Sequence, residues 1–92
     1  MQKSLKSPEY ARLIAQLAAA REAADVRQTE LAEKLGRHQS FIAKYEGGER
    51  RIDVVEFIAI AEALGADPVK LFKDFLAGKP PAPVAKKKRA RK

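Results

Sequence analysis

The sequence predicts an all-α fold of five helices, and three observations support that prediction. Apolar residues recur three or four positions apart in five stretches, which is the spacing of one helix face. Two of these stretches open with a capping residue followed by proline, Ser7-Pro8 and Asp67-Pro68, a typical helix start. No stretch combines two-residue alternation with β-branched residues, so we expect no sheet.

The first helix is predicted from about residue 8 to residue 23. Glu9 lies favourably near the positive end of the helix dipole, and three consecutive alanines add helix propensity. The apolar positions are Tyr10, Leu13, Ile14, Leu17 and Ala20 or Ala24. Residues 25–27 form the connection to the next helix, and we expect Val26 to turn into the core.

Two short helices are predicted next, over about 28–35 and 39–46, with little chain between them. Their apolar sets have the same spacing: Leu31, Ala32 and Leu35, then Phe41, Ile42 and Tyr45. Gly36 between them can take the left-handed conformation that ends a helix. Two short helices joined by a tight glycine turn predict a helix-turn-helix, whose second helix fits the major groove of DNA.

The last two helices follow Gly47-Gly48, a pair of glycines that ends the preceding helix. Asp53 can cap the fourth helix, which should end at Gly65. Its predicted apolar face is Val54, Phe57, Ile60 (or Ile58), Ala61 and Leu64. The fifth helix starts at Pro68, and its apolar residues are Val69, Leu71, Phe72, Phe75 and Leu76.

The composition limits the possible classes of protein. A chain of 92 residues is one domain's worth, enough for a single small core. The absence of cysteine excludes disulfides and fits a reducing cytoplasm, and no apolar run is long enough for a membrane span or a signal peptide. There is one histidine, no glycine-rich phosphate loop and no acid cluster beside a nucleophile. We therefore expect no enzyme, no metal, no cofactor and no small-molecule substrate.

The charge is concentrated at the C-terminus. The chain has 19 Lys and Arg against 12 Asp and Glu, but residues 79–92 hold seven of the bases and no acid. Residues 1–78 are balanced, so the net charge of +7 does not argue that the folded body binds DNA. We expect a flexible N-terminus over 1–6, a folded domain over 7–78, and a disordered tail over 79–92 that is proline-rich and then basic.

Three segments resemble the Cro/repressor-type (XRE-type) helix-turn-helix proteins of bacteria and phages: QTELAEKLG, QSFIAKYEGGER and IAIAEALG. The match covers about Leu13 to Leu76 in separated blocks. It implies a five-helix, lambda-repressor-like DNA-binding domain. Two positions depart from the pattern, because Arg27 and His38 stand where the family usually has Ser or Thr.

The resemblance also implies which residues read the bases. Gln39, Ser40 and Lys44, with Ala43 between them, fall on the family's base-reading positions. The residue types suit the task, since Gln can bond adenine through two atoms and Lys can donate to guanine. Two placements remain open for Phe41: contact with a thymine methyl or sugar, or cover for the edge of the core.

Phosphate contacts are expected around the same helix, where they would fix register without reading sequence. The candidates are Gln28, Arg37, His38, Arg50 and Arg51. His38 is also a candidate cap for its helix, and a solvated charged loop is the alternative for Arg50 and Arg51. Glu46 resembles an inward-facing glutamate of the family and is expected to pair internally.

The resemblance implies a sequence-specific transcriptional regulator, a repressor that binds a palindromic operator as a homodimer. Surplus apolar residues of the fifth helix are candidates for the dimer seam: Val69, Phe72, Phe75 and Leu76. The alternative is that this helix only closes the core. Other functions stay open: an antitoxin-type autorepressor with a toxin partner, a protein-interaction or co-regulator module, and a non-specific nucleoid or RNA-binding protein.

The tail sequence KKKRARK is read separately from the domain. It resembles a nuclear import signal, but this interpretation does not apply to a bacterial or phage protein, since bacteria have no nucleus. A sequence-independent phosphate-binding arm is the simpler hypothesis, and a solubilising or partner-binding tail is the alternative.

Overall fold

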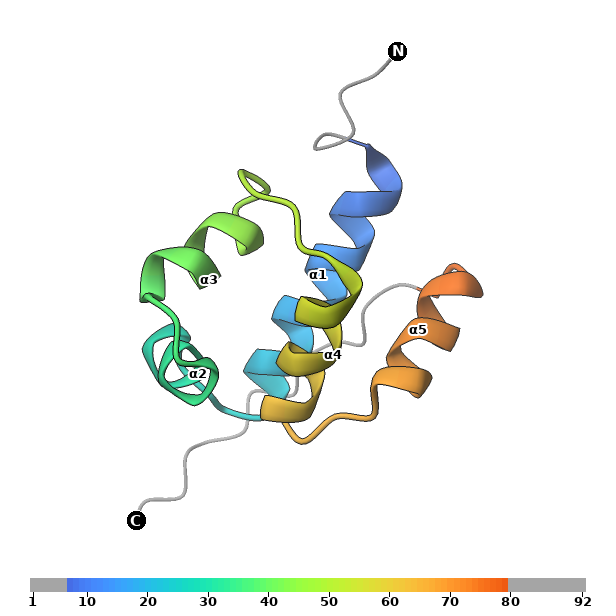
Figure 1. Ribbon diagram of the computed structural model, residues 1–92. Helices are drawn as coiled ribbons and strands as arrows, with labels where there is room; N and C mark the ends of the chain where they lie inside the picture. The colour runs from blue at the N-terminus through green and yellow to red at the C-terminus, as the bar shows by residue number, and fades with distance from the viewer. Residues whose placement is uncertain (1–6, 80–92) are drawn as a thin grey trace.

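The computed structural model describes residues 7–79, which form five α-helices and no strand (Figure 1). In chain order the helices are α1 (Pro8–Ala23), α2 (Gln28–Leu35), α3 (Gln39–Glu46), α4 (Val54–Ala63) and α5 (Pro68–Leu76). The predicted all-α fold and the predicted helix positions are confirmed. The predictions for residues 1–6 and for the tail from residue 80 onward lie outside the described residues.

Local capping explains where three of the helices begin. The Ser7 hydroxyl accepts a hydrogen bond from the Tyr10 N–H, and Pro68 follows a capping Asp67 at the start of α5. At α4 the cap is reciprocal: the Asp53 carboxylate accepts from the Glu56 N–H at 2.7 Å, and the Glu56 carboxylate accepts from the Asp53 N–H at 2.9 Å. This is the capping-box arrangement, which satisfies two N–H groups at once.

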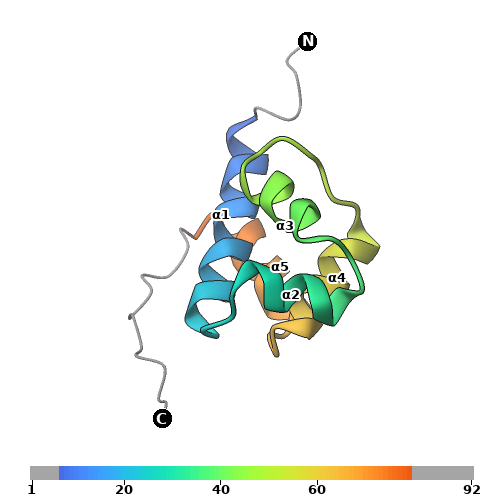
Figure 2. The ribbon, with the colours of Figure 1, turned by 90° about the vertical axis from the view of Figure 1, so that its left-hand side faces the viewer.

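The core lies among the first four helices: α1 packs against α3 and α4, and α2 packs against the same two helices (Figure 2). Its largest fully buried side chains come from four helices: Leu17, Leu31, Ile42, Tyr45 and Ile60. Each buried leucine or isoleucine among them contributes about 1.5–3 kcal/mol relative to exposure. Val26 packs against this core from the connection, as predicted.

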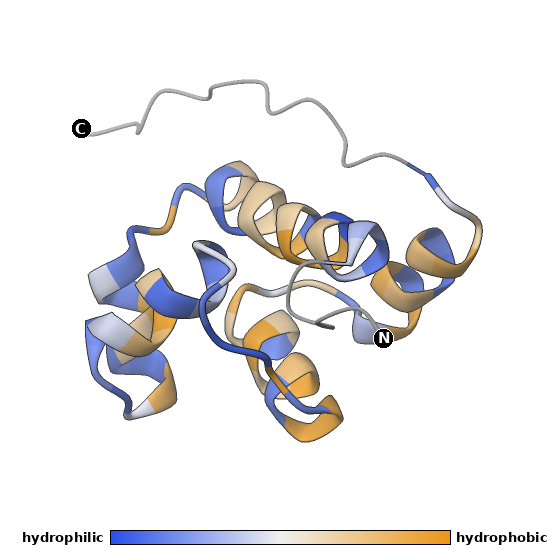
Figure 3. Ribbon diagram, turned by 90° about the horizontal axis from the view of Figure 1, so that it is seen from above, coloured by the Kyte–Doolittle hydropathy of each residue, from blue (hydrophilic) through white to orange (hydrophobic). Residues whose placement is uncertain are grey.

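The apolar face of α4 differs from the prediction at its first residue. Phe57, Ile60 and Leu64 are buried as expected, but Val54 is 71% exposed. Val54 lies in the first turn, beyond the edge of the core, so the periodicity that predicted its burial continues past the residues that could cover it. α4 is apolar along most of its length (Figure 3).

None of the residues of α5 is fully buried. Leu71 packs against the core, and two polar side chains of α1 bind the backbone of α5. The Gln16 amide donates to the Leu71 carbonyl at 2.8 Å, and the Arg12 guanidinium donates to the Phe75 carbonyl at 3.0 Å while lying over the Phe75 ring. Leu71 and these polar contacts therefore hold one side of α5, while Val69, Phe72 and Leu76 stay exposed.

Candidate nucleic-acid interface

The turn between α2 and α3 has the predicted glycine geometry. Gly36 has a φ of +67°, in the left-handed region, where a residue with a Cβ would be strained. The Arg37 N–H donates to the Ala32 carbonyl at 2.9 Å and closes the end of α2. α3 begins three residues after Gly36, so α2 and α3 form a helix-turn-helix at one end of the molecule (Figure 1).

The two faces of α3 have different roles. Phe41, Ile42 and Tyr45 are buried, whereas Gln39, Ser40 and Lys44 are exposed and Ala43 is half-buried. The predicted base-contact residues therefore share the outward side of the helix. Phe41 is only 7% exposed, which favours the role of covering the core edge over contact with a thymine methyl or sugar.

A network of polar side chains holds the start of α3. The Arg21 guanidinium of α1 pairs with the Glu46 carboxylate at 2.7 Å, so Glu46 pairs internally as expected. The Gln28 amide donates to Glu46 at 2.9 Å and accepts from the Gln39 amide at 2.8 Å. The predicted phosphate contact Gln28 therefore also orients the first residue of α3, which the sequence did not reveal.

Two of the predicted phosphate-contact residues lie together on an aromatic ring. The guanidinium carbons of Arg37 and Arg50 lie 3.9 and 4.8 Å from the centre of the Phe41 ring. Both guanidinium groups contact the Glu56 carboxylate, Arg50 at 3.2 and 3.3 Å and Arg37 at 3.4 Å. Burial opposes the ionisation of Glu56, but the Asp53 N–H and the Arg50 guanidinium outweigh it and lower the pKa of Glu56.

The loop between α3 and α4 is fastened by Tyr10 of α1. The Tyr10 hydroxyl donates to the Arg50 carbonyl at 3.0 Å and accepts from the Ile52 N–H at 3.1 Å. The Arg51 guanidinium lies 4.4 Å from the centre of the Tyr10 ring. Burial is the main reason that the pKa of Tyr10 is raised. The sequence identified Tyr10 only as an apolar position, because its loop partners lie about forty residues away.

The two departures from the family pattern have visible consequences. Neither Arg27 nor His38 donates or accepts a side-chain cap bond at the start of its helix. The Glu30 carboxylate accepts from the Arg27 N–H at 2.7 Å, so part of the cap at α2 is supplied from within the helix. The expectation that the His38 side chain caps α3 is wrong, and this exposed side chain keeps only its predicted role toward phosphate.

Comparisons with known proteins agree with this geometry. The model of the helix-turn-helix domain family matches residues 12–71. An XRE-family like protein from Pseudomonas syringae pv. tomato is similar in structure, with a TM-score of 0.74 and 44% sequence identity. That similarity covers 78% of this chain and 88% of the other. The chain belongs to the XRE-type helix-turn-helix family.

Family membership identifies this XRE-type chain as a DNA-binding regulator and points away from an enzyme. Among curated proteins, none matches the chain. None of the helices in the described part is long and apolar enough to cross a membrane.

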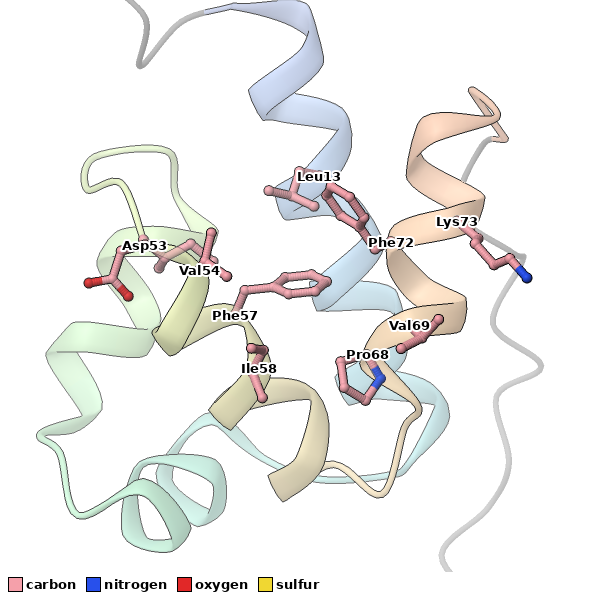
Figure 4. A pocket seen from close by; sticks show the side chains of 10 residues that line it. Leu13, Asp53, Val54, Phe57, Ile58, Pro68, Val69, Phe72 and Lys73 are labelled. Carbon is pink, nitrogen blue, oxygen red and sulfur yellow. The ribbon is translucent and has the colours of Figure 1, made fainter.

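A second surface of the XRE-type domain is apolar and lies between α4 and α5. The α4–α5 groove has a volume of about 360 Å³ and is lined by Leu13, Val54, Phe57, Ile58, Val69 and Phe72, among others (Figure 4). Phe57 and Phe72 meet edge to face, with their ring centres 6.2 Å apart. Of the seam candidates, Val69, Phe72 and Leu76 are exposed, whereas Phe75 is half-buried.

Proposed function

We propose that this protein is a sequence-specific transcriptional regulator of the cytoplasm, a repressor that inserts α3 into the major groove of DNA. Gln39, Ser40, Ala43 and Lys44 contact base edges. The observation that carries this proposal is the split of α3 into a buried apolar face and an exposed polar face. A recognition helix requires this split, because its inner face must pack while its outer face reads the groove.

The proposal assigns phosphate contacts to residues on both sides of α3. Three of these residues are held by neighbouring side chains: Arg37 and Arg50 by Phe41 and Glu56, and Arg51 by Tyr10. The full set flanks α3 in sequence and comprises Gln28, Arg37, His38, Arg50 and Arg51. Side chains that are already ordered lose less conformational entropy on binding. This order supports their assignment to the DNA backbone, where they would fix the register of α3.

A homodimer completes the proposal. The α4–α5 groove and the exposed side chains of Val69, Phe72 and Leu76 supply an apolar surface that a second copy could cover. The half-buried Phe75 ring lies beside Phe72, with the ring centres 6.1 Å apart. Such a pair would place two copies of α3 about one turn of DNA, roughly 34 Å, apart. The operator would then be a palindrome.

Selection of bound duplexes from a pool of random-sequence DNA tests the proposal. We expect the full chain to select a palindromic consensus. Gln39→Ala and Lys44→Ala should each relax the preference at particular bases, by about 1–3 kcal/mol of discrimination. Lys34→Ala, an exposed lysine on α2, is the matched control and should retain the consensus.

An opposite result would favour a different function. If the selected pool stays random and binding disappears on removal of residues 80–92, the tail alone binds nucleic acid. The α4–α5 groove then supports the reading of the domain as a protein-interaction or co-regulator module, because it is an exposed apolar surface suited to a protein partner.

A further inference from the structure

Glu56 lies outside the helix-turn-helix, yet it contacts two of the arginines assigned to phosphate. It is the third residue of α4, and its side chain is 19% exposed, against 39% for both Arg37 and Arg50. An acid close to bound DNA ordinarily weakens binding by repulsion. Because Glu56 nevertheless contacts both arginines, we expect a role in which it helps DNA binding instead of weakening it.

We propose that Glu56 is a positioning residue of the DNA interface: it holds Arg37 and Arg50 against Phe41 so that their free N–H groups are presented to phosphates. This inference rests on the proposed function and deepens it. We call this unit the arginine clamp; it consists of Arg37, Arg50, Phe41 and Glu56. Its formal charge is +1, so it still attracts an anion.

The hydrogen bonds of the clamp leave donors available. A guanidinium group has five N–H donors. Arg37 uses one nitrogen toward Glu56, and Arg50 uses two nitrogens toward Glu56 and the Arg51 carbonyl. Each arginine is thus fixed at one edge by the carboxylate and on one face by the Phe41 ring, and N–H groups remain for a phosphate oxygen.

Glu56 is also shared with the helix cap, which makes a clean substitution possible. One of its oxygens accepts from the Asp53 N–H in the capping box of α4. Glutamine can take the same place in a capping box. Glu56→Gln therefore retains the cap and removes the charge that orients the arginines. Glu49→Gln is the matched control, because Glu49 is an exposed acid of the loop before α4 and takes part in no ion pair among the described residues.

The experiment measures the affinity of the full chain and its variants for a short DNA duplex of mixed sequence, over a range of salt concentrations. Every variant keeps the basic tail, so the contribution of the tail is the same throughout. Glu49→Gln should strengthen binding about twofold by removing one negative charge. Glu56→Gln should weaken binding about threefold despite the same change of charge, because two arginine side chains lose their fixed orientation.

The same substitution has an opposite effect once the arginines are absent. In a chain carrying Arg37→Ala and Arg50→Ala, Glu56→Gln should strengthen binding about twofold, as Glu49→Gln does. A purely structural role of Glu56 would not reverse the sign. Melting followed by circular dichroism should show that each variant remains folded.

Two results would overturn the inference, and they differ from failure of the proposed function. If Glu56→Gln strengthens binding as much as Glu49→Gln in the otherwise unchanged chain, Glu56 only repels DNA or sequesters the arginines. If Arg37→Ala and Arg50→Ala each leave the log–log salt slope unchanged, rather than reducing it by about 0.9, the clamp does not contact phosphate. Neither result depends on the selection of a consensus, which tests base reading by α3.

Discussion

Two surfaces of this small domain are built in opposite ways. The recognition region, which comprises α2, α3 and the loop over residues 47–53, presents polar side chains that neighbouring residues already hold by hydrogen bonds and ring contacts. The α4–α5 groove presents apolar side chains that are largely exposed in the described chain: Val54, Ile58, Val69 and Phe72. Polar side chains at a wet surface can hold one another in place by hydrogen bonds. Apolar side chains leave water only when another apolar surface packs against them.

This difference separates the kinds of partner that each surface suits. Cationic and amide groups that are held in place can bind the regularly spaced phosphates and base edges of duplex DNA. An open apolar groove suits a second protein surface, which buries it. The stability of the recognition region should therefore depend on its internal hydrogen bonds and ion pairs, and self-association of the protein should depend on the groove.

The largest expected effect is on the network that holds α3. Arg21→Ala removes the partner of Glu46, and the side chains of this pair are only 13% and 10% exposed. Breaking such a pair leaves a carboxylate nearly buried without its counter-charge, so the free energy of unfolding should fall by about 3 kcal/mol. Urea unfolding followed by circular dichroism measures this change.

A surface ion pair supplies the control for Arg21→Ala. Lys70 pairs with Asp74 on the exposed side of α5, and Lys70→Ala should leave the free energy of unfolding close to that of the wild type. Equal effects of the two substitutions would mean that the Arg21–Glu46 pair does not stabilise the recognition region more than a surface pair does.

The second prediction concerns the groove. Val69→Asp would place a carboxylate in the proposed seam, where a covering copy would have to desolvate it. We expect the dimer dissociation constant to rise about a hundredfold, which corresponds to about 2.7 kcal/mol. Sedimentation equilibrium measures this change.

The control for Val69→Asp is another exposed valine outside the groove. Val55 is 74% exposed on α4, close to the 64% of Val69, but it does not line the groove. Val55→Asp should leave self-association unchanged. If both variants associate as the wild type does, the α4–α5 groove is not the dimer seam.

The sequence predicted the parts of this structure that short-range signals determine. Ser7-Pro8, Asp67-Pro68 and Gly36 mark helix ends through contacts within a few residues, and those ends are where the sequence placed them. Helical periodicity also separated the inner and outer faces of α3 correctly.

The remaining features depend on where the helices meet in space. Glu56 and Arg37 are nineteen residues apart, Arg21 and Glu46 twenty-five, and Tyr10 and Arg50 forty. No spacing rule brings such residues together before the fold is known. Val54 shows the same limit for burial, because periodicity gives the direction of a side chain but not the extent of the core that could cover it.

The smallest expected effect compares two tyrosine hydroxyl groups. The Tyr10 hydroxyl has two backbone partners in the loop that carries Arg50, whereas the buried Tyr45 hydroxyl has no hydrogen-bond partner among the described residues. Burial, the largest cause, raises the pKa of Tyr45 well above its ordinary value, because the charged form would lose its hydration. A buried hydroxyl without a partner has lost its hydration without compensation.

Removing the two hydroxyl groups should therefore change stability in opposite directions. Tyr10→Phe should lower the free energy of unfolding by about 1 kcal/mol, because two bonds to the loop are lost, and Tyr45→Phe should raise it by about 1 kcal/mol. Urea unfolding at neutral pH measures both changes. A loss of stability in Tyr45→Phe would instead show that the hydroxyl has a hydrogen-bond partner, such as an ordered water molecule. The core under α3 would then contain a buried hydrogen bond, as the surface of the recognition region contains exposed ones.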